Sequence, residues 1–201
     1  MNYITGSCTI SRGTVLKDGH QLFEKKSGDA SAFLLSVYQY FGLNYPKFYK
    51  MDNLSKLGWL ASEVLLKESF KKENHQPEDV GIVLANKNSS LDNDIKYFET
   101  VKDVASPSLF VYTLPNIVIG EICIRNNFKG EHAFYIQEEF DTGFIANQVN
   151  YLLDNDILQA CICGWVDILQ EEYKAVLFWV ERQNGEGAVP FSSENMNSIF
   201  K

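Results

Sequence analysis

The sequence predicts an α/β layered domain built on five strands. Short β-branched runs alternate with longer amphipathic stretches along the 201 residues, a pattern typical of α/β domains. Hydrophobic residues make up 45% of the chain and charged residues 22%, which suffices for an ordinary core and excludes a disordered chain. A chain of 201 residues favours one domain over two small ones.

The expected strands and helices alternate. Strands are predicted at residues 3–10, 80–85, 133–137, 157–164 and 173–181. The clearest helix pattern covers residues 54–70, where apolar residues recur every three or four positions behind the capping candidate Asp52. A first helix at 30–41 opens after Asp29 and stops at Gly42. Further helices are expected at 90–103, 115–127 and 142–154.

The end of the chain differs from the rest in composition. Residues 183–201 are polar and contain few apolar side chains, so we expect a loosely docked polar tail there. The folded domain is then expected to span residues 1–182.

Charge and hydropathy exclude several classes of function. The chain has 18 Lys and Arg against 26 Asp and Glu, a formal net charge of −8, and lacks a basic run that could follow a phosphate backbone, so no nucleic acid partner is expected. Its first residues lack the features of a signal peptide, and no apolar run approaches the ~18 residues of a membrane helix. We therefore expect a cytoplasmic protein without a membrane partner.

The cysteines and histidines do not predict a metal centre. Cys8, Cys123, Cys161 and Cys163 lie in apolar surroundings, as expected for reduced core thiols. The three histidines are too scattered to complete a zinc site. We expect neither a metal nor a cofactor.

Four segments in order carry a family resemblance. They are YITGSCTIS, KMDNLSKLGWLASEVLLKES, EDVGIVLANKNSSL and TLPNIVIGEICIRNNFKGEHAFYI. This series resembles the N-terminal half of the β-ketoacyl-acyl carrier protein synthases, which have the thiolase-like fold. The resemblance implies αβα layers around a mixed five-stranded sheet whose last strand is antiparallel. A complete synthase has two such halves, and we expect the second to be absent here.

The resemblance also implies where a nucleophile belongs. The family places a cysteine on a tight turn between a strand and a helix, where the helix N-terminus lowers the thiol pKa. Counting back from Gly143 puts Phe140 at this position, and counting forward from Gly130 puts Glu139 there. Neither residue is a thiol, and the active-site histidines of the family belong to the absent half. We expect no catalysis by this chain alone.

Carboxylates at the same turn allow another interpretation. Glu138, Glu139 and Asp141 could form an acid/base cluster. The alternative is that they cap the following helix and complement its dipole, with Asp141 as the cap. The second interpretation is favoured because nothing else in the sequence indicates a sugar cleft.

Two surfaces are implied as contacts for other proteins. Lys47 and Lys50 lie just before the Met51–Asp52 pair, where the family docks its acidic carrier protein, and an ordinary solvated loop is the alternative. Family members also dimerise through the third strand of this half. The equivalent residues here are Ala133, Phe134, Tyr135, Ile136 and Gln137. A homodimer, or a heterodimer with a full-length ketosynthase, is therefore expected.

Together these features predict a non-catalytic, ketosynthase-like accessory protein. Its role would resemble that of a chain length factor in fatty-acid or polyketide/aryl-polyene-type biosynthesis. One alternative is half of a split condensing enzyme, with another chain supplying the histidines. A second alternative is a module that binds an acyl chain or small molecule in the vacated acyl tunnel.

Overall fold

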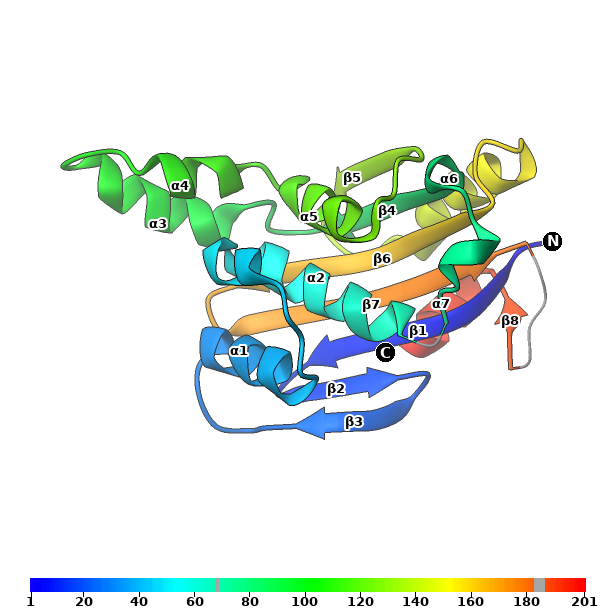
Figure 1. Ribbon diagram of the computed structural model, residues 1–201, viewed down its shortest axis with the longest axis horizontal. Helices are drawn as coiled ribbons and strands as arrows, with labels where there is room; N and C mark the ends of the chain where they lie inside the picture. The colour runs from blue at the N-terminus through cyan, green and yellow to red at the C-terminus, as the bar shows by residue number, and fades with distance from the viewer. Residues whose placement is uncertain (68, 183–186) are drawn as a thin grey trace.

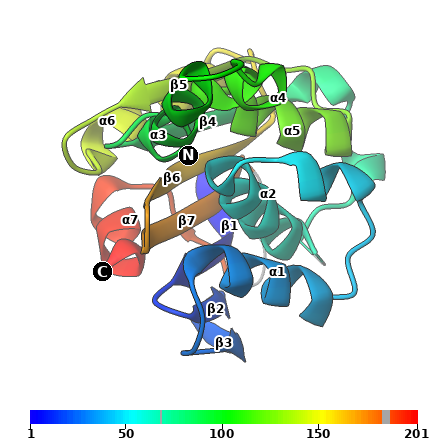
Figure 2. The same ribbon diagram turned by 90° about the vertical axis from the view of Figure 1, so that its left-hand side faces the viewer.

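The computed structural model describes residues 1–67, 69–182 and 187–201. A mixed eight-stranded sheet lies between two layers of helices (Figures 1 and 2). Along the sheet the strands follow the order β3-β2-β1-β7-β6-β4-β5, and β8 pairs with β1. The expected αβα layering is confirmed, while the expected number of five strands is too small.

All five predicted strands are present and lie next to one another in this sheet, with β5 at its edge. β4 is parallel to β5 and β6, whereas β7 is antiparallel to both β6 and β1, as the family resemblance implies. The strands are β1 (Tyr3–Ser11), β4 (Val80–Asn86), β5 (His132–Ile136), β6 (Ala160–Leu169) and β7 (Glu172–Glu181).

A hairpin that the sequence interpretation missed extends the sheet beyond β1. It consists of β2 (Thr14–Lys17) and β3 (His20–Glu24). Its turns contain Arg12-Gly13 and Asp18-Gly19, and all four of these residues have positive φ. Two-residue turns with positive φ suit the twist of antiparallel strands, and Asp-Gly is a strong signal for them.

The first helical layer covers one face of the sheet. It contains α1 (Ala30–Tyr40), α2 (Asn53–Leu66) and α5 (Ile117–Asn126). η1 (Pro46–Lys50) lies between α1 and α2, and η2 (Lys72–Asn74) and η3 (Pro77–Asp79) lie between α2 and β4. Asp52 caps α2 by accepting a hydrogen bond from Ser55 N at 3.0 Å. A Cβ on Gly58 would lie 2.4 Å from Val118 Cγ2, so the glycine permits the close packing of α2 on α5.

The second layer, on the opposite face, contains α6 (Thr142–Asp154) and α7 (Ser193–Phe200) (Figure 2). The expectation of a loosely docked tail is not met by these residues. Met196 of α7 is fully buried and Phe191, which follows β8 (Val189–Pro190), is 7% exposed. Their burial against the sheet core supplies stability that the polar composition of the segment does not indicate. The proposed boundary at residue 182 remains a prediction.

A helical arm projects beyond the end of the sheet (Figure 1). It consists of α3 (Leu91–Val101), α4 (Pro107–Phe110) and η4 (Val111–Thr113). Among the described residues no single helix meets the length and apolarity of a membrane span. The pair Pro107–Thr113 and Ile117–Asn126 meets them only jointly, across a bend of 97°.

Candidate functional site

The turn between β5 and α6 is where the resemblance implies a nucleophile. Gln137 N donates to Asn86 O at 2.8 Å, which fixes the end of β5 against β4. Asp141 then caps α6, because its Oδ1 accepts from Phe144 N at 2.8 Å. The cap interpretation of Asp141 agrees with this geometry, and Glu138 and Glu139 are exposed.

Phe140 is the inward-facing residue of this turn. Its side chain is 8% exposed, and its ring lies 4.8 Å from that of Phe200, 5.8 Å from that of Trp165 and 6.5 Å from that of Phe178, centroid to centroid. Of the two candidate positions, Phe140 therefore faces the core and Glu139 faces solvent. Aromatic rings occupy the space below the turn.

Helix α7 closes the turn from outside. Thr142 is the first residue of α6. Its Oγ1 lies 2.7 Å from Ser193 Oγ and accepts a hydrogen bond from Asn197 Nδ2 at 2.8 Å. Lys174 Nζ donates to Phe200 O at 2.5 Å. These polar contacts hold Phe200 over Phe140, so a segment that the sequence indicated as a tail packs over the turn.

None of the four cysteines is an exposed thiol with a lowered pKa. All four are free; Cys8, Cys161 and Cys163 are buried, and Cys123 is partly buried. Burial raises the pKa of Cys161 to about 12 and that of Cys123 to about 11. Because the thiolate is the reactive form, these groups are poor nucleophiles near neutral pH.

The histidines lie away from the turn. His20 and His132 are exposed at strand ends. His75 Nε2 is 3.0 Å from Glu181 Oε1, and its ring packs against Phe70 and Trp179. In the described part of the chain, no group of three or more His, Cys, Asp or Glu residues could hold a metal ion.

The two lysines ahead of α2 have different surroundings. Lys47 Nζ lies 2.9 Å from Glu121 Oε2, and Glu121 is only 3% exposed. The Tyr112 hydroxyl donates to the other oxygen of Glu121 at 3.1 Å, and burial together with this carboxylate raises the pKa of Tyr112. Lys47 therefore neutralises a buried acid. Lys50 is exposed, and no ion pair in the described chain includes it.

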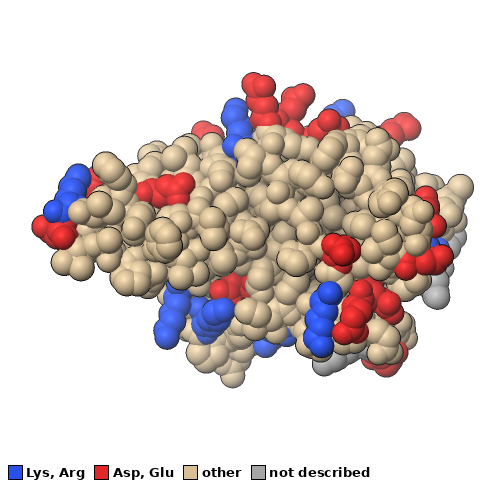
Figure 3. All heavy atoms as spheres, turned by 90° about the horizontal axis from the view of Figure 1, so that it is seen from above, with Lys and Arg blue, Asp and Glu red and all other residues tan. Residues whose placement is uncertain are grey.

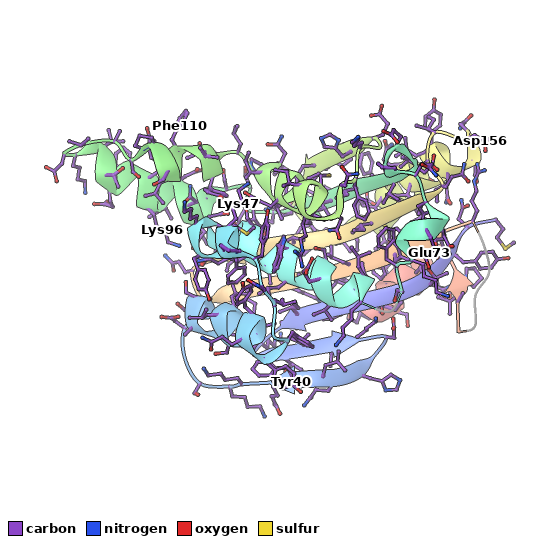
Figure 4. The ribbon with its side chains drawn as sticks, viewed as in Figure 1. Tyr40, Lys47, Glu73, Lys96, Phe110 and Asp156 are labelled. Atoms are coloured by element: carbon purple, nitrogen blue, oxygen red, sulfur yellow. The ribbon has the colours of Figure 1, made fainter. Side chains whose placement is uncertain are left out.

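Lys47 is not alone on its side of the molecule. Figure 4 labels it together with Lys96, whose Nζ pairs with Asp92 Oδ2 at 2.6 Å. Lys56 lies nearby, because the charge of Lys96 contributes, after burial, to lowering the pKa of Lys56. The sequence interpretation missed Lys56 and Lys96, since η1, α2 and α3 come together only in the fold.

The predicted interface strand is an edge of the sheet. β5 pairs with β4 and is the last strand in the sheet order. Ile136 is 54% exposed, and the side chains of Ala133, Phe134, Tyr135 and Gln137 are partly buried. The edge position is as expected, and its use as an interface remains a prediction.

No protein-family model matches the chain, and no curated protein is a significant match. Solved structures do match. The ishigamide ketosynthase/chain length factor superposes with a TM-score of 0.66 at 15% identity, over 92% of this chain and 63% of that one. The ketosynthase ApeO in complex with its chain length factor ApeC, from Xenorhabdus doucetiae, gives 0.61 at 14% identity over 92% and 81%.

A third similar structure is AntDE:AntF, a type II PKS acyl-carrier protein in complex with its ketosynthase bound to the hexaketide. Its TM-score is 0.64 at 16% identity, over 90% of this chain and 62% of that chain. The chain thus spans less than two thirds of the length of two of these three structures. The chain has the fold of ketosynthase/chain length factor proteins, and the fold resemblance noted in the four sequence segments is confirmed.

Proposed function

We propose that this chain is a non-catalytic, chain-length-factor-like accessory protein of a cytoplasmic ketosynthase in fatty-acid or polyketide/aryl-polyene-type biosynthesis. The observation that carries the proposal is Phe140, an aromatic residue packed into the turn where the family resemblance implies a thiol. Two of the similar structures contain a chain length factor with a ketosynthase. The ketosynthase-like scaffold without its nucleophile is consistent with this role.

The free edge of β5 supports pairing with a ketosynthase. Ile82 N donates to Glu131 O, and Gln137 N donates to Asn86 O. Because backbone groups alternate in direction along a strand, the amides of Ala133 and Tyr135 also face β4. Those of Phe134 and Ile136 then face away from the sheet and are available to a strand of the partner.

The surface around this edge supports the same partner. Figure 3 looks onto the side along which α4, α5 and β5 lie, and its central area has few charged atoms. Large apolar side chains are exposed on the arm, α5 and β5, among them Phe98, Val104, Phe110, Leu114, Ile124 and Ile136. Phe110 lies on the outer side of α4 (Figure 4). Extended apolar surface of this kind favours association.

Carrier-protein contact is a second, smaller part of the proposal. Lys50 is the candidate contact, because it is exposed and without an ion pair in the described chain. Lys47 is already paired with the buried Glu121, so its role in docking would be secondary.

The decisive experiment mixes the purified chain with an intact ketosynthase from the same biosynthetic locus. Light scattering on the eluted species should show a one-to-one complex. Its buried interface should exceed the ~2,000 Å² of obligate pairs. A monodisperse monomer that does not shift when the ketosynthase is added would contradict the proposal. A self-paired species that excludes the ketosynthase would favour a homodimer instead.

A companion experiment tests the absence of catalysis. Phe140→Cys and Glu139→Cys restore a thiol at either candidate position, and neither variant should carry out condensation without the acid/base groups. Mass spectrometry after incubation with an acyl-carrier substrate should show no adduct on the unmodified protein. Condensation that appears when a histidine-bearing chain is added would instead favour the split enzyme.

A further inference from the structure

A large cleft lies at the carboxyl ends of β1, β4 and β6. Its volume is about 1140 Å³. It is bounded by the β1–β2 turn, the loop after β4, the β6–β7 turn and the last turn of α7. In sheets with parallel strands, ligands commonly bind outside this end. The cleft is separate from the edge of β5 on which the proposed association depends.

Four cationic side chains line the cleft without a carboxylate partner. They are Arg12, Lys87, Lys174 and Lys201, and none of them takes part in an ion pair with another described residue. Arg12 lies at the tip of the β1–β2 turn with φ 48°. On a chain with a net charge of −8, such a group of unpaired cations is unusual.

Two carboxylates of the cleft accept hydrogen bonds from backbone amides and form no ion pair with its cations. Asp167 stands opposite Lys174 in the β6–β7 register, yet its Oδ1 accepts from the amides of Lys87 and Asn88 at 3.1 and 2.9 Å. Glu171 reaches Ala30 N at 2.8 Å, at the start of α1 on the other face of the sheet. Glu172, which is exposed, is the remaining acid in the cleft.

The positive charges of Lys174 and Arg12 repel each other across the cleft. Burial and the positive charge of Arg12 both lower the pKa of Lys174. Its ammonium lies 3.6 Å from the ring centroid of Phe200, which forms an apolar wall of the cleft. An anion bound between Arg12 and Lys174 would relieve the repulsion between these two cations.

We propose that this cleft binds a phosphate monoester with an apolar tail. The phosphate would contact Arg12 and Lys174, with Lys87 at the rim, and the tail would lie against Phe200. Four cations around the cleft favour a dianionic phosphate over a monoanionic carboxylate. This ligand site goes beyond the proposed association with a ketosynthase.

The test is calorimetric titration of the full chain with hexyl phosphate, inorganic phosphate and hexanoate in a phosphate-free buffer. Hexyl phosphate should bind most tightly, and its affinity should fall as salt increases. Arg12→Asn and Lys174→Gln should each weaken it about tenfold or more, the loss of one charge-assisted contact. Asn tolerates positive φ, so the first variant keeps the turn. Lys129→Gln, an exposed cation after α5, is the matched control and should bind normally.

A second measurement does not depend on variants. Amide chemical shifts upon addition of hexyl phosphate should move at Gly13, Lys87 and Asn88. Absence of saturable binding, equal affinities in both cleft variants and the control, or shifts confined to other regions would each overturn the proposal. Equal binding of hexanoate would overturn the preference for phosphate.

Discussion

The turn at the carboxyl end of β5 and the outer edge of β5 differ in how well they are packed. In the turn, Phe140 packs against three aromatic rings, and α7 covers it through Thr142. Along the edge, no described strand pairs with β5 on its outer side, and Ile136 is 54% exposed. The turn is therefore filled by side chains, whereas the outer edge of β5 is exposed and can pair with another strand.

This difference shows which of the two regions contributes to the stability of the folded chain. Closing the turn buries aromatic surface, which stabilises the fold, and the ring of Phe200 lies against that of Phe140. The open edge contributes nothing to the stability of this chain by itself. Function should therefore be sought in what the surfaces bind rather than in the interior of the turn.

Phe140→Ala should have the largest effect on the closed region. Removing the ring leaves a cavity beside Phe178 and Phe200, at an expected cost of about 3–5 kcal/mol in the free energy of unfolding. Glu139→Ala, one residue away and exposed, should change it by less than about 0.5 kcal/mol. Urea denaturation measures both, and equal values would show that the turn is not packed as described.

Proline substitutions in β5 distinguish its inner and outer sides. Tyr135→Pro removes an amide that faces β4 and should cost about 3 kcal/mol in the free energy of unfolding. Ile136→Pro removes an amide that faces outward, so the monomer should stay close to its original stability. Complex formation with the ketosynthase should nevertheless be lost, whereas Ile136→Ala should keep it. Light scattering reads the complex, and thermal melting reads the fold.

High pH should lower the free energy of unfolding, because burial raises the pKa of thiols in both core clusters, Cys161 among them. Burial raises the pKa of Cys161, under α6, from 9.0 to about 12. The unfolded thiol ionises above pH 9 while the folded one stays protonated, so this contribution is complete below pH 9 and is lost as the pH rises towards 12. The loss amounts to at most ~1.4 kcal/mol per pH unit. Urea unfolding at pH 8, 9 and 10 should show a smaller pH dependence for Cys161→Ala, and identical slopes would contradict this.

Substitutions at the two lysines should have the smallest effects on binding. Lys50→Glu should weaken carrier-protein binding by about 1 kcal/mol or less, as expected for a single exposed charge. Lys47→Gln should instead lower the stability of the chain, because it leaves Glu121 buried without its partner. Fluorescence anisotropy of a labelled carrier protein and thermal melting separate the two outcomes. If Lys47→Gln weakened carrier-protein binding more than Lys50→Glu, Lys47 rather than Lys50 would be the carrier-protein contact.

The sequence predicted the central strands because their apolar runs follow a local pattern, and it placed α6 correctly behind its Asp141 cap. The β2–β3 hairpin was missed although Asp18-Gly19 is a local signal for it. The docking of α7 could not be predicted, because Met196 is buried, and Phe200 partly buried, against residues far away in the sequence. Helix α2 ends at Leu66, earlier than residue 70.

The candidate site was also predicted only in part from the sequence. Counting from glycines left Glu139 and Phe140 as equal candidates, since only the direction of the backbone decides which side chain enters the core. Lys47 was grouped with Lys50, because its partner Glu121 lies on α5 and becomes a neighbour only in the fold. Local spacing therefore located the turn, and tertiary contacts determined the role of each residue.

The position of β1 between β2 and β7 has a consequence for folding on the ribosome. Tyr3 is in register with Glu181, so almost the whole described chain must be synthesised before β1 acquires its second neighbour. Contacts of such large sequence separation close slowly. Until then the nascent chain exposes one side of β1, with its ITG segment, to other unfinished chains. Slow translation or chaperone capture before residue 181 should therefore control the yield of native protein.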